Sequence, residues 1–128
     1  MAGFNPLQRV TKSYLAAADY SARQHRLVRI SGLYAVLASL RSEVNGVLLN
    51  APSAAGQTAE VCIHGPCEVK TDGSVSQNNW LMPDASGYAS NAALGAGTGV
   101  RIIGKAMEAD GGAGSIIQAW IDQMQGQL

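Results

Sequence analysis

The chain has few charged residues. Of its 128 residues, 14% are Asp, Glu, Lys or Arg, against about 25% in a typical soluble domain. A chain with so few charges either covers its surface with small and amide side chains or buries part of that surface against neighbours. The second option favours a protein that works inside an assembly. The length suits one domain with its own core and is too short for two comfortable ones.

Long apolar runs and targeting signals are missing as well. No run approaches the ~20 apolar residues that a membrane-spanning helix needs. The first four residues lack the basic and then apolar pattern of a secretory signal. Ala2 stands where N-myristoylation requires a glycine. We therefore expect synthesis in a cytoplasm and no membrane partner.

Charge is spread unevenly along the chain although the net charge is zero. Residues 1–41 sum to +5 and residues 42–128 to −5. This asymmetry suits head-to-tail contacts between copies, or a basic arm docked on an acidic surface. The early basic residues can equally be ordinary solvated side chains. Dispersed basic residues in a neutral chain argue against a nucleic-acid partner.

The beginning of the chain predicts an extended arm. Asn5-Pro6 interrupts regular structure, and no apolar periodicity develops before Tyr14. We expect an N-terminal arm over residues 1–16 and a single β-rich domain over residues 17–128. The alanine-rich residues 14–26 favour at most one short helix of one or two turns.

From residue 27 the pattern changes to short strands separated by turns. Val28 and Ile30 alternate with polar neighbours, and Asn45-Gly46 and Asp72-Gly73 are tight-turn pairs. We expect strands near residues 27–31, 34–39, 47–49, 59–63, 67–71, 80–82, 101–109 and 115–121. Many short strands at close spacing predict a mainly β protein, folded as a small single-domain β-barrel or β-sandwich.

The soft metal ligands gather at one bend, where Cys62, His64 and Cys67 lie within six residues. A zinc site normally takes four ligands from two separated pairs. The other histidine, His25, is far away in sequence, so we expect no metal site. In a cytoplasm the two cysteines should be free thiols on adjacent strands, although a disulfide across the bend is conceivable.

Catalytic patterns are weak. The glycine-rich residues 95–99 superficially match a phosphate loop, but a strand pattern follows them where a helix should begin, and no Gly-Lys-Ser/Thr ending is present. Glu60, Cys62 and His64 share one strand face, where neighbours two apart cannot meet in attack geometry. We expect neither enzymatic activity nor a cofactor.

Residues 46–52, Gly-Val-Leu-Leu-Asn-Ala-Pro, and residues 103–108, Ile-Gly-Lys-Ala-Met-Glu, carry a family resemblance through their order and spacing. Together with residues 56–61, 83–87 and 115–121 they resemble the small bacteriophage head decoration proteins, also called capsid cement proteins. The similarity runs from about residue 18 to Ile121 and excludes residues 1–16. It implies a non-enzymatic virion protein that binds the outer capsid surface and clamps neighbouring major capsid subunits. It also implies a homotrimer at or near local threefold axes.

Two sets of contact residues follow from this reading. Anchoring and basic side chains in the predicted arm are candidates for the contact with the major capsid protein: Phe4, Pro6, Leu7, Arg9 and Lys12. Interfaces concentrate aromatic residues, so the candidates for the subunit interface are Trp80, Ile116 and Trp120.

Two other classes of protein remain open. A head–tail joining or tail protein would share this composition but would form a ring of different symmetry. A glycan-binding module would need an exposed aromatic platform with polar partners, and Trp80 beside Asn78 and Asn79 offers one.

Overall fold

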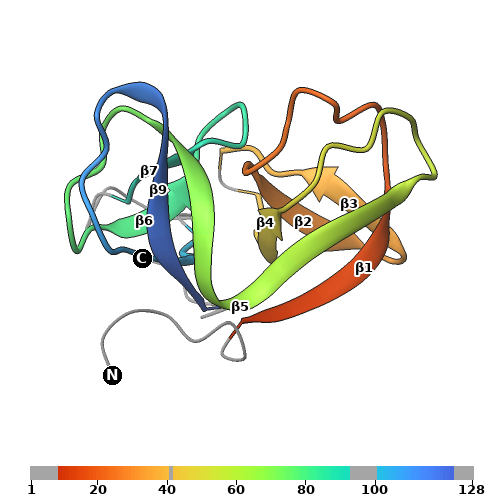
Figure 1. Cartoon of the computed structure of the whole chain (residues 1–128), viewed down its shortest axis with the longest axis horizontal. Helices are drawn as coiled ribbons and strands as arrows, with labels where there is room; N and C mark the ends of the chain where they lie inside the picture. The colour runs from red at the N-terminus through yellow and green to blue at the C-terminus, as the bar shows by residue number, and fades with distance from the viewer. Residues whose placement is uncertain (1–8, 41, 93–100, 123–128) are drawn as a thin grey trace.

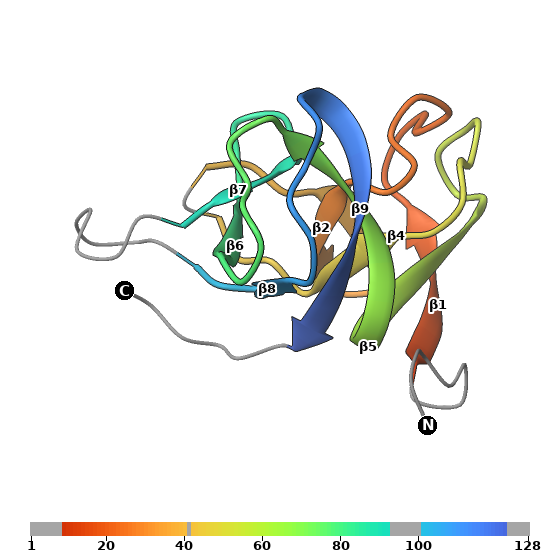
Figure 2. The same cartoon turned by 60° about the vertical axis from the view of Figure 1, so that its left-hand side comes forward.

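A computed structural model describes residues 9–40, 42–92 and 101–122 (Figures 1 and 2). All regular structure in these ranges is strand. The strands are β1 (Val10–Ala16), β2 (Leu27–Ser31), β3 (Tyr34–Leu37), β4 (Gly46–Leu48), β5 (Thr58–Asp72), β6 (Trp80–Pro83), β7 (Ala89–Asn91), β8 (Gly104–Ala106) and β9 (Ala113–Asp122). Within these residues no helix is long and apolar enough to cross a membrane. The mainly β prediction is therefore confirmed.

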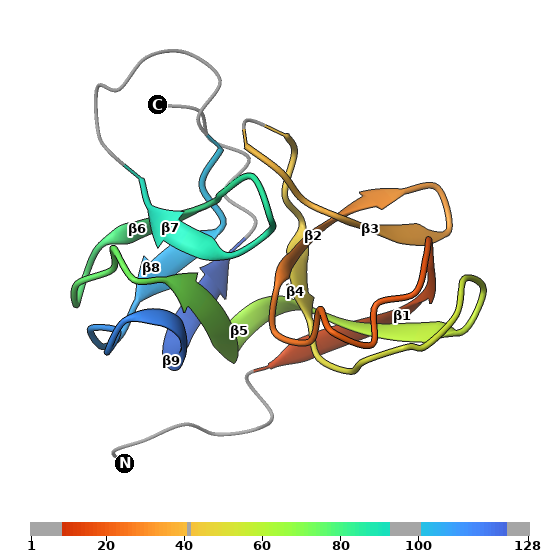
Figure 3. The ribbon, with the colours of Figure 1, turned by 90° about the horizontal axis from the view of Figure 1, so that it is seen from above.

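The strands form one sheet that closes on itself twice. Their order is β1-β3-β2-β4-β5-β7-β6-β8-β9, and both β1 and β9 also pair with β5. One closed ring, the first barrel, contains β1, β3, β2, β4 and the beginning of β5. The other ring, the second barrel, contains the end of β5 with β7, β6, β8 and β9. Figure 3 shows the two barrels side by side with β5 running through both.

β5 serves both barrels because it bends in the middle. Residues 58–64 pair with β1, and residues 64–72 pair with β9. Gly65 has φ +98°, a conformation that glycine adopts with little strain. This residue shifts the in–out alternation by one position, so Cys62 before it and Cys67 after it enter the same core. The two strands expected at residues 59–63 and 67–71 are therefore one strand, since Gly65-Pro66 bends the chain without reversing it.

Each barrel has its own buried cluster, and the two clusters meet at the junction. The first barrel is filled by Ala16, Tyr20, Val28, Ala35, Leu48, Ala59 and Val61. The cluster of the second barrel includes Val69, Leu81, Ile103, Ile117 and Ile121. Leu27, Val47 and Cys62 point outward from the first barrel and belong to this second cluster. The barrels are thus packed against each other through side chains of the shared wall.

The predicted arm over residues 1–16 is wrong from Val10 onward. Residues 10–16 form β1, in which Lys12 pairs with Val61 and Leu15 with Thr58. Tyr14 and Ala16 pack into the first core. Burial of these side chains and pairing to β5 stabilise a strand that the local sequence pattern does not reveal. Residues 1–8 lie outside the described residues.

Two other local expectations also need correction. The short helix expected within residues 14–26 does not form, because residues 14–16 belong to β1 and residues 17–26 are turns and bends. The long strand expected at residues 101–109 shrinks to β8, Gly104–Ala106. β7 was not anticipated, since its three residues are too short to give a pattern.

Candidate interaction surface

The cysteine-rich bend is part of the core. Cys62 and Cys67 are free thiols, both fully buried, and they lie on one strand and not on adjacent strands as expected. The hydrogen bond between the two thiols, together with burial, raises the pKa of the Cys67 thiol. Glu60 accepts a hydrogen bond from Ser13 at 2.8 Å, while His64 is exposed. Among the described residues, no group of three or more His, Cys, Asp or Glu side chains could hold a metal ion.

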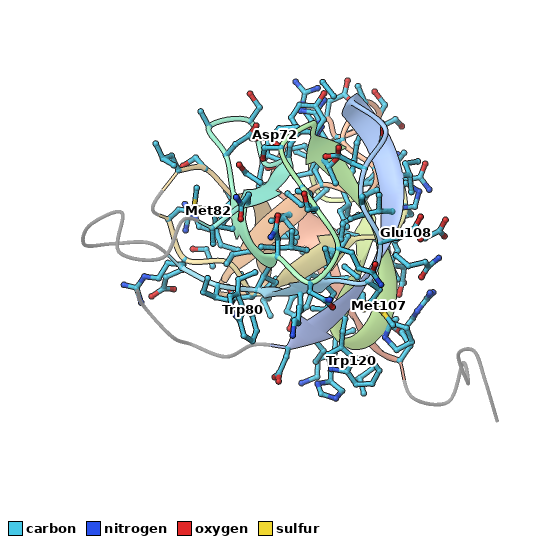
Figure 4. The ribbon with its side chains drawn as sticks, turned by 90° about the vertical axis from the view of Figure 1, so that its left-hand side faces the viewer. Asp72, Trp80, Met82, Met107, Glu108 and Trp120 are labelled. Carbon is cyan, nitrogen blue, oxygen red and sulfur yellow. The ribbon has the colours of Figure 1, made fainter. Side chains whose placement is uncertain are left out.

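The most distinctive surface lies on the outside of the second barrel. Trp80 on β6 pairs directly with Lys105 on β8, and Lys105 pairs with Trp120 on β9. Neighbouring strands lie about 4.8 Å apart, so the lysine stands between the two indole rings. Its Nζ atom is 5.2 Å from the centroid of the Trp80 ring, which is a cation–π contact. Figure 4 shows both tryptophans at the same, lower side of this barrel.

The sequence of β8 explains the tight spacing of this row. A Cβ atom at Gly104 would overlap the carbonyl oxygen of Trp120. Glycine therefore lets the backbone of β8 lie directly against β9, while the alternation of β8 turns Lys105 outward between buried Gly104 and Ala106. The register of β6, β8 and β9 therefore fixes the distance between the backbones of the two tryptophans.

Two shallow hollows flank Lys105 and Trp120. One, of about 240 Å³, is lined by Trp80, Gly104, Lys105, Trp120 and Asp122. The other, of about 340 Å³, is lined by Gln77, Asn78, Lys105, Ala106, Met107 and Trp120. We call the surface formed by Trp80, Lys105, Met107, Trp120 and Asp122 the tryptophan face. His64 borders it, with its ring edge-on to Trp120 at 5.7 Å between centroids.

The structure brings together two of the three predicted interface residues. Trp80 and Trp120 both belong to the tryptophan face. Ile116 is 47% exposed on the same side of β9 but lies four residues further back, opposite Lys70, and lines neither hollow. Sequence reasoning missed Lys105. The small–large–small alternation of Gly104, Lys105 and Ala106 was the signal that could have revealed it.

The candidate capsid contacts fall into two groups. Phe4, Pro6 and Leu7 lie outside the described residues. Arg9 and Lys12 are exposed, and Arg9 Nε donates a hydrogen bond to the carbonyl oxygen of Pro66 at 2.9 Å. Because Pro66 is the cross-strand partner of Trp120, Arg9 is held near the edge of the tryptophan face.

A second exposed apolar surface lies on the outside of the first barrel. The turn between β2 and β3 leaves Leu33 71% and Tyr34 45% exposed. Arg29 pairs with Val36, and Ser31 pairs with Tyr34. These four residues point to the outside of the barrel, so the exposed surface extends from the turn over both strands. We call Arg29, Leu33, Tyr34 and Val36 the tyrosine face. It lies on the opposite barrel from the tryptophan face, so each copy presents two separate apolar surfaces.

The two barrels also differ in charge. Among the described residues, positions 9–64, which form the first barrel, carry five basic and three acidic side chains, and positions 65–122 carry three basic and six acidic ones. Within the same residues no Lys or Arg nitrogen lies within ion-pair distance of a carboxylate. Exposed charged side chains such as Lys12, Glu68 and Asp122 are therefore available for contacts outside the monomer.

No protein-family model matches the sequence, and no curated protein matches it. The fold, however, has a counterpart. It is similar to the head fiber gp8.5 N base of bacteriophage phi29. The superposition has a TM-score of 0.65 and covers 90% of this chain and 95% of the other, at 14% sequence identity. At this identity the similarity is one of fold, and it extends over nearly the whole length of both chains.

Proposed function

We propose that this protein is a structural component of a phage virion that binds the outer surface of the head. The observation that carries the proposal is the similarity of fold to the head fiber base, which covers 95% of that chain. The neighbour belongs to a phage head. Because one fold can host many functions, this likeness supports a role in the virion by analogy of fold, over 95% of the neighbour's chain.

The finer role that we infer is that of a cement protein. It bridges neighbouring major capsid subunits, clamps them and acts as a homotrimer. The order of residues 46–52 and 103–108 supports this role through its resemblance to decoration proteins. The pair of exposed apolar faces supports the homotrimer, because each copy in a ring contacts two neighbouring copies.

The contact residues divide between the two kinds of neighbour. Phe4, Pro6, Leu7, Arg9 and Lys12 are assigned to the contact with the major capsid protein. Basic residues at this contact would be steered toward an acidic shell surface, and the attraction would weaken as salt rises. Trp80, Trp120 and, at the far end of β9, Ile116 are assigned to the contact between copies.

Co-sedimentation with phage heads assembled without this protein tests the proposal. The purified protein should bind intact heads to saturation, raise the temperature at which they break open, and appear in a cryo-EM map as density on the outer shell. Heads from an unrelated phage provide the control. Failure to bind intact heads would contradict the proposal. Density confined to the head–tail vertex would instead identify a joining protein.

A further inference from the structure

The tryptophan face has the composition of the centre of a protein interface. Trp, Tyr, Met and Arg are enriched at such centres, and a few of them carry most of the binding energy. Trp80 and Trp120 stand in fixed register on either side of Lys105, and Met107 beside them is 38% exposed. The hollows next to Trp120, of about 240 and 340 Å³, are large enough to hold side chains of another molecule.

The tyrosine face offers side chains that protrude. Leu33 lies in the turn between β2 and β3 and is the most exposed large hydrophobic residue of the described chain. Tyr34 begins β3, where pairing with Ser31 holds its backbone in place. Protruding apolar side chains on one barrel and hollows between aromatic rings on the other are complementary in shape.

The net charges of the two barrels favour one of the two possible contacts between copies. If two tryptophan faces met, two second barrels of the same negative charge would come together. If a tryptophan face meets a tyrosine face, the acidic barrel of one copy opposes the basic barrel of the next. Complementary charges fix the orientation of a contact and suppress the wrong one. Arg29 is the charged residue of the tyrosine face and Asp122 is the acidic residue of the tryptophan face, so we expect these two to pair in the contact.

We propose that the tryptophan face of one copy binds the tyrosine face of a second copy, head to tail, and that repetition of this contact closes the ring of the homotrimer. The proposal rests on the homotrimer inferred above and adds the pair of surfaces that builds it. A head-to-tail contact uses two different patches of each subunit, and a rotation that closes gives a ring. Every copy then needs both faces.

Two variants separate this arrangement from a contact between identical faces. The first replaces Trp80 and Trp120 by alanine, and the second replaces Leu33 and Tyr34 by serine. Leu40→Ser, at an exposed apolar residue in the loop between β3 and β4, is the matched control. Circular dichroism and thermal melting establish that each variant is folded, and light scattering after size-exclusion chromatography gives its mass.

The wild type and Leu40→Ser should be trimers, and each face variant alone should be a monomer. Loss of such anchors should weaken association by about thirtyfold or more. A mixture of the two variants keeps one intact tryptophan face and one intact tyrosine face, so it should form a one-to-one dimer that cannot close. A mixture that stays monomeric, or a tyrosine-face variant that still forms trimers, would overturn the proposal.

Charge exchange tests the orientation without removing aromatic residues. Arg29→Glu and Asp122→Arg should each weaken the trimer, and the double variant should recover most of the loss. A double variant as weak as the two single effects combined would show that these charges do not face each other, and the orientation would be wrong. Wild-type protein that binds heads but remains monomeric on them would refute this inference and leave head binding intact.

Discussion

The two barrels share a strand but are filled differently. The buried cluster of the first barrel contains the alanines Ala16, Ala35 and Ala59 around Tyr20, whose phenol oxygen accepts a hydrogen bond from the Leu37 backbone N–H at 2.9 Å. The cluster of the second barrel also contains alanines, but it has no aromatic side chain and takes in the outward residues of the shared wall. The first core therefore contains one aromatic plug, Tyr20. The second core is aliphatic, with two cysteines, and also holds the junction together.

The junction contains polar contacts in addition to the apolar ones. The Arg26 guanidinium lies 4.1 Å from the centroid of the Tyr88 ring, donates one hydrogen bond to the Tyr88 hydroxyl at 2.9 Å and another to the Ser86 carbonyl at 3.1 Å. The Leu27 N–H donates to the Gly87 carbonyl at 2.7 Å. These contacts tie the start of β2 to the turn before β7, so the barrels should unfold together.

The largest effect should come from removing β1. Deleting residues 1–13 takes away most of a strand that closes the first barrel against β5, and we expect the protein to lose its cooperative thermal transition. Deleting residues 1–8 leaves β1 intact and should preserve that transition. Differential scanning calorimetry of the two truncated proteins makes the comparison. A cooperative transition after the longer deletion would show that the second barrel folds alone.

A matched pair of cavities tests whether the barrels unfold as one unit. Leu48 in the first core and Leu81 in the second are both fully buried. Substitution of either by alanine should cost about 2–5 kcal/mol in the free energy of unfolding. In urea titrations followed by circular dichroism and by tryptophan fluorescence, both variants should show one shared transition. Two separated transitions in the Leu48→Ala variant would mean that the first barrel opens independently.

Tyr20→Phe isolates the hydrogen bond of the aromatic plug. The ring remains in place while the Leu37 N–H loses its acceptor, so stability should fall by about 1–2 kcal/mol. Tyr14→Phe, in a residue that packs on the same cluster from its edge, is the control and should change stability less. Equal effects from the two substitutions would show that the hydroxyl of Tyr20 contributes little.

The smallest effect should come from adding a reducing agent. Cys62 and Cys67 form no cross-link, so the wild-type protein should melt at the same temperature with and without that agent. Because both thiols are fully buried, native protein should react slowly with a thiol reagent at neutral pH. Denatured protein should react quickly. Rapid reaction of the native protein would contradict this packing.

Two strands of the first barrel show how much of the fold sequence patterns could predict. β2 was predicted with its observed bounds, 27–31, because Val28 and Ile30 alternate cleanly with Arg29 and Ser31. β1 was missed because Lys12 and Ser13 are polar and exposed, and its stabilising partners lie about fifty residues later in β5. Long-range pairing of this kind leaves little trace in local composition.

The candidate surface was also only partly predictable, because its geometry depends on pairing between strands that are distant in sequence. Aromatic residues are recognisable as anchors one at a time, so Trp80 and Trp120 were identified. They flank Lys105 because β8 lies between β6 and β9 in the sheet. The order of strands in the sheet cannot be read from the local sequence. The double closure on β5 was likewise hidden, since Gly65-Pro66 looks like the end of a strand.

The bend in β5 has a mechanical consequence. A single strand passes through both barrels and is paired along its length, first with β1 and then with β9. No flexible linker joins the two barrels at this strand. A force that pulls one barrel away from the other therefore acts along the β5 backbone and is resisted by the hydrogen bonds that β5 makes with β1 and with β9. The two barrels should therefore move together as one rigid body.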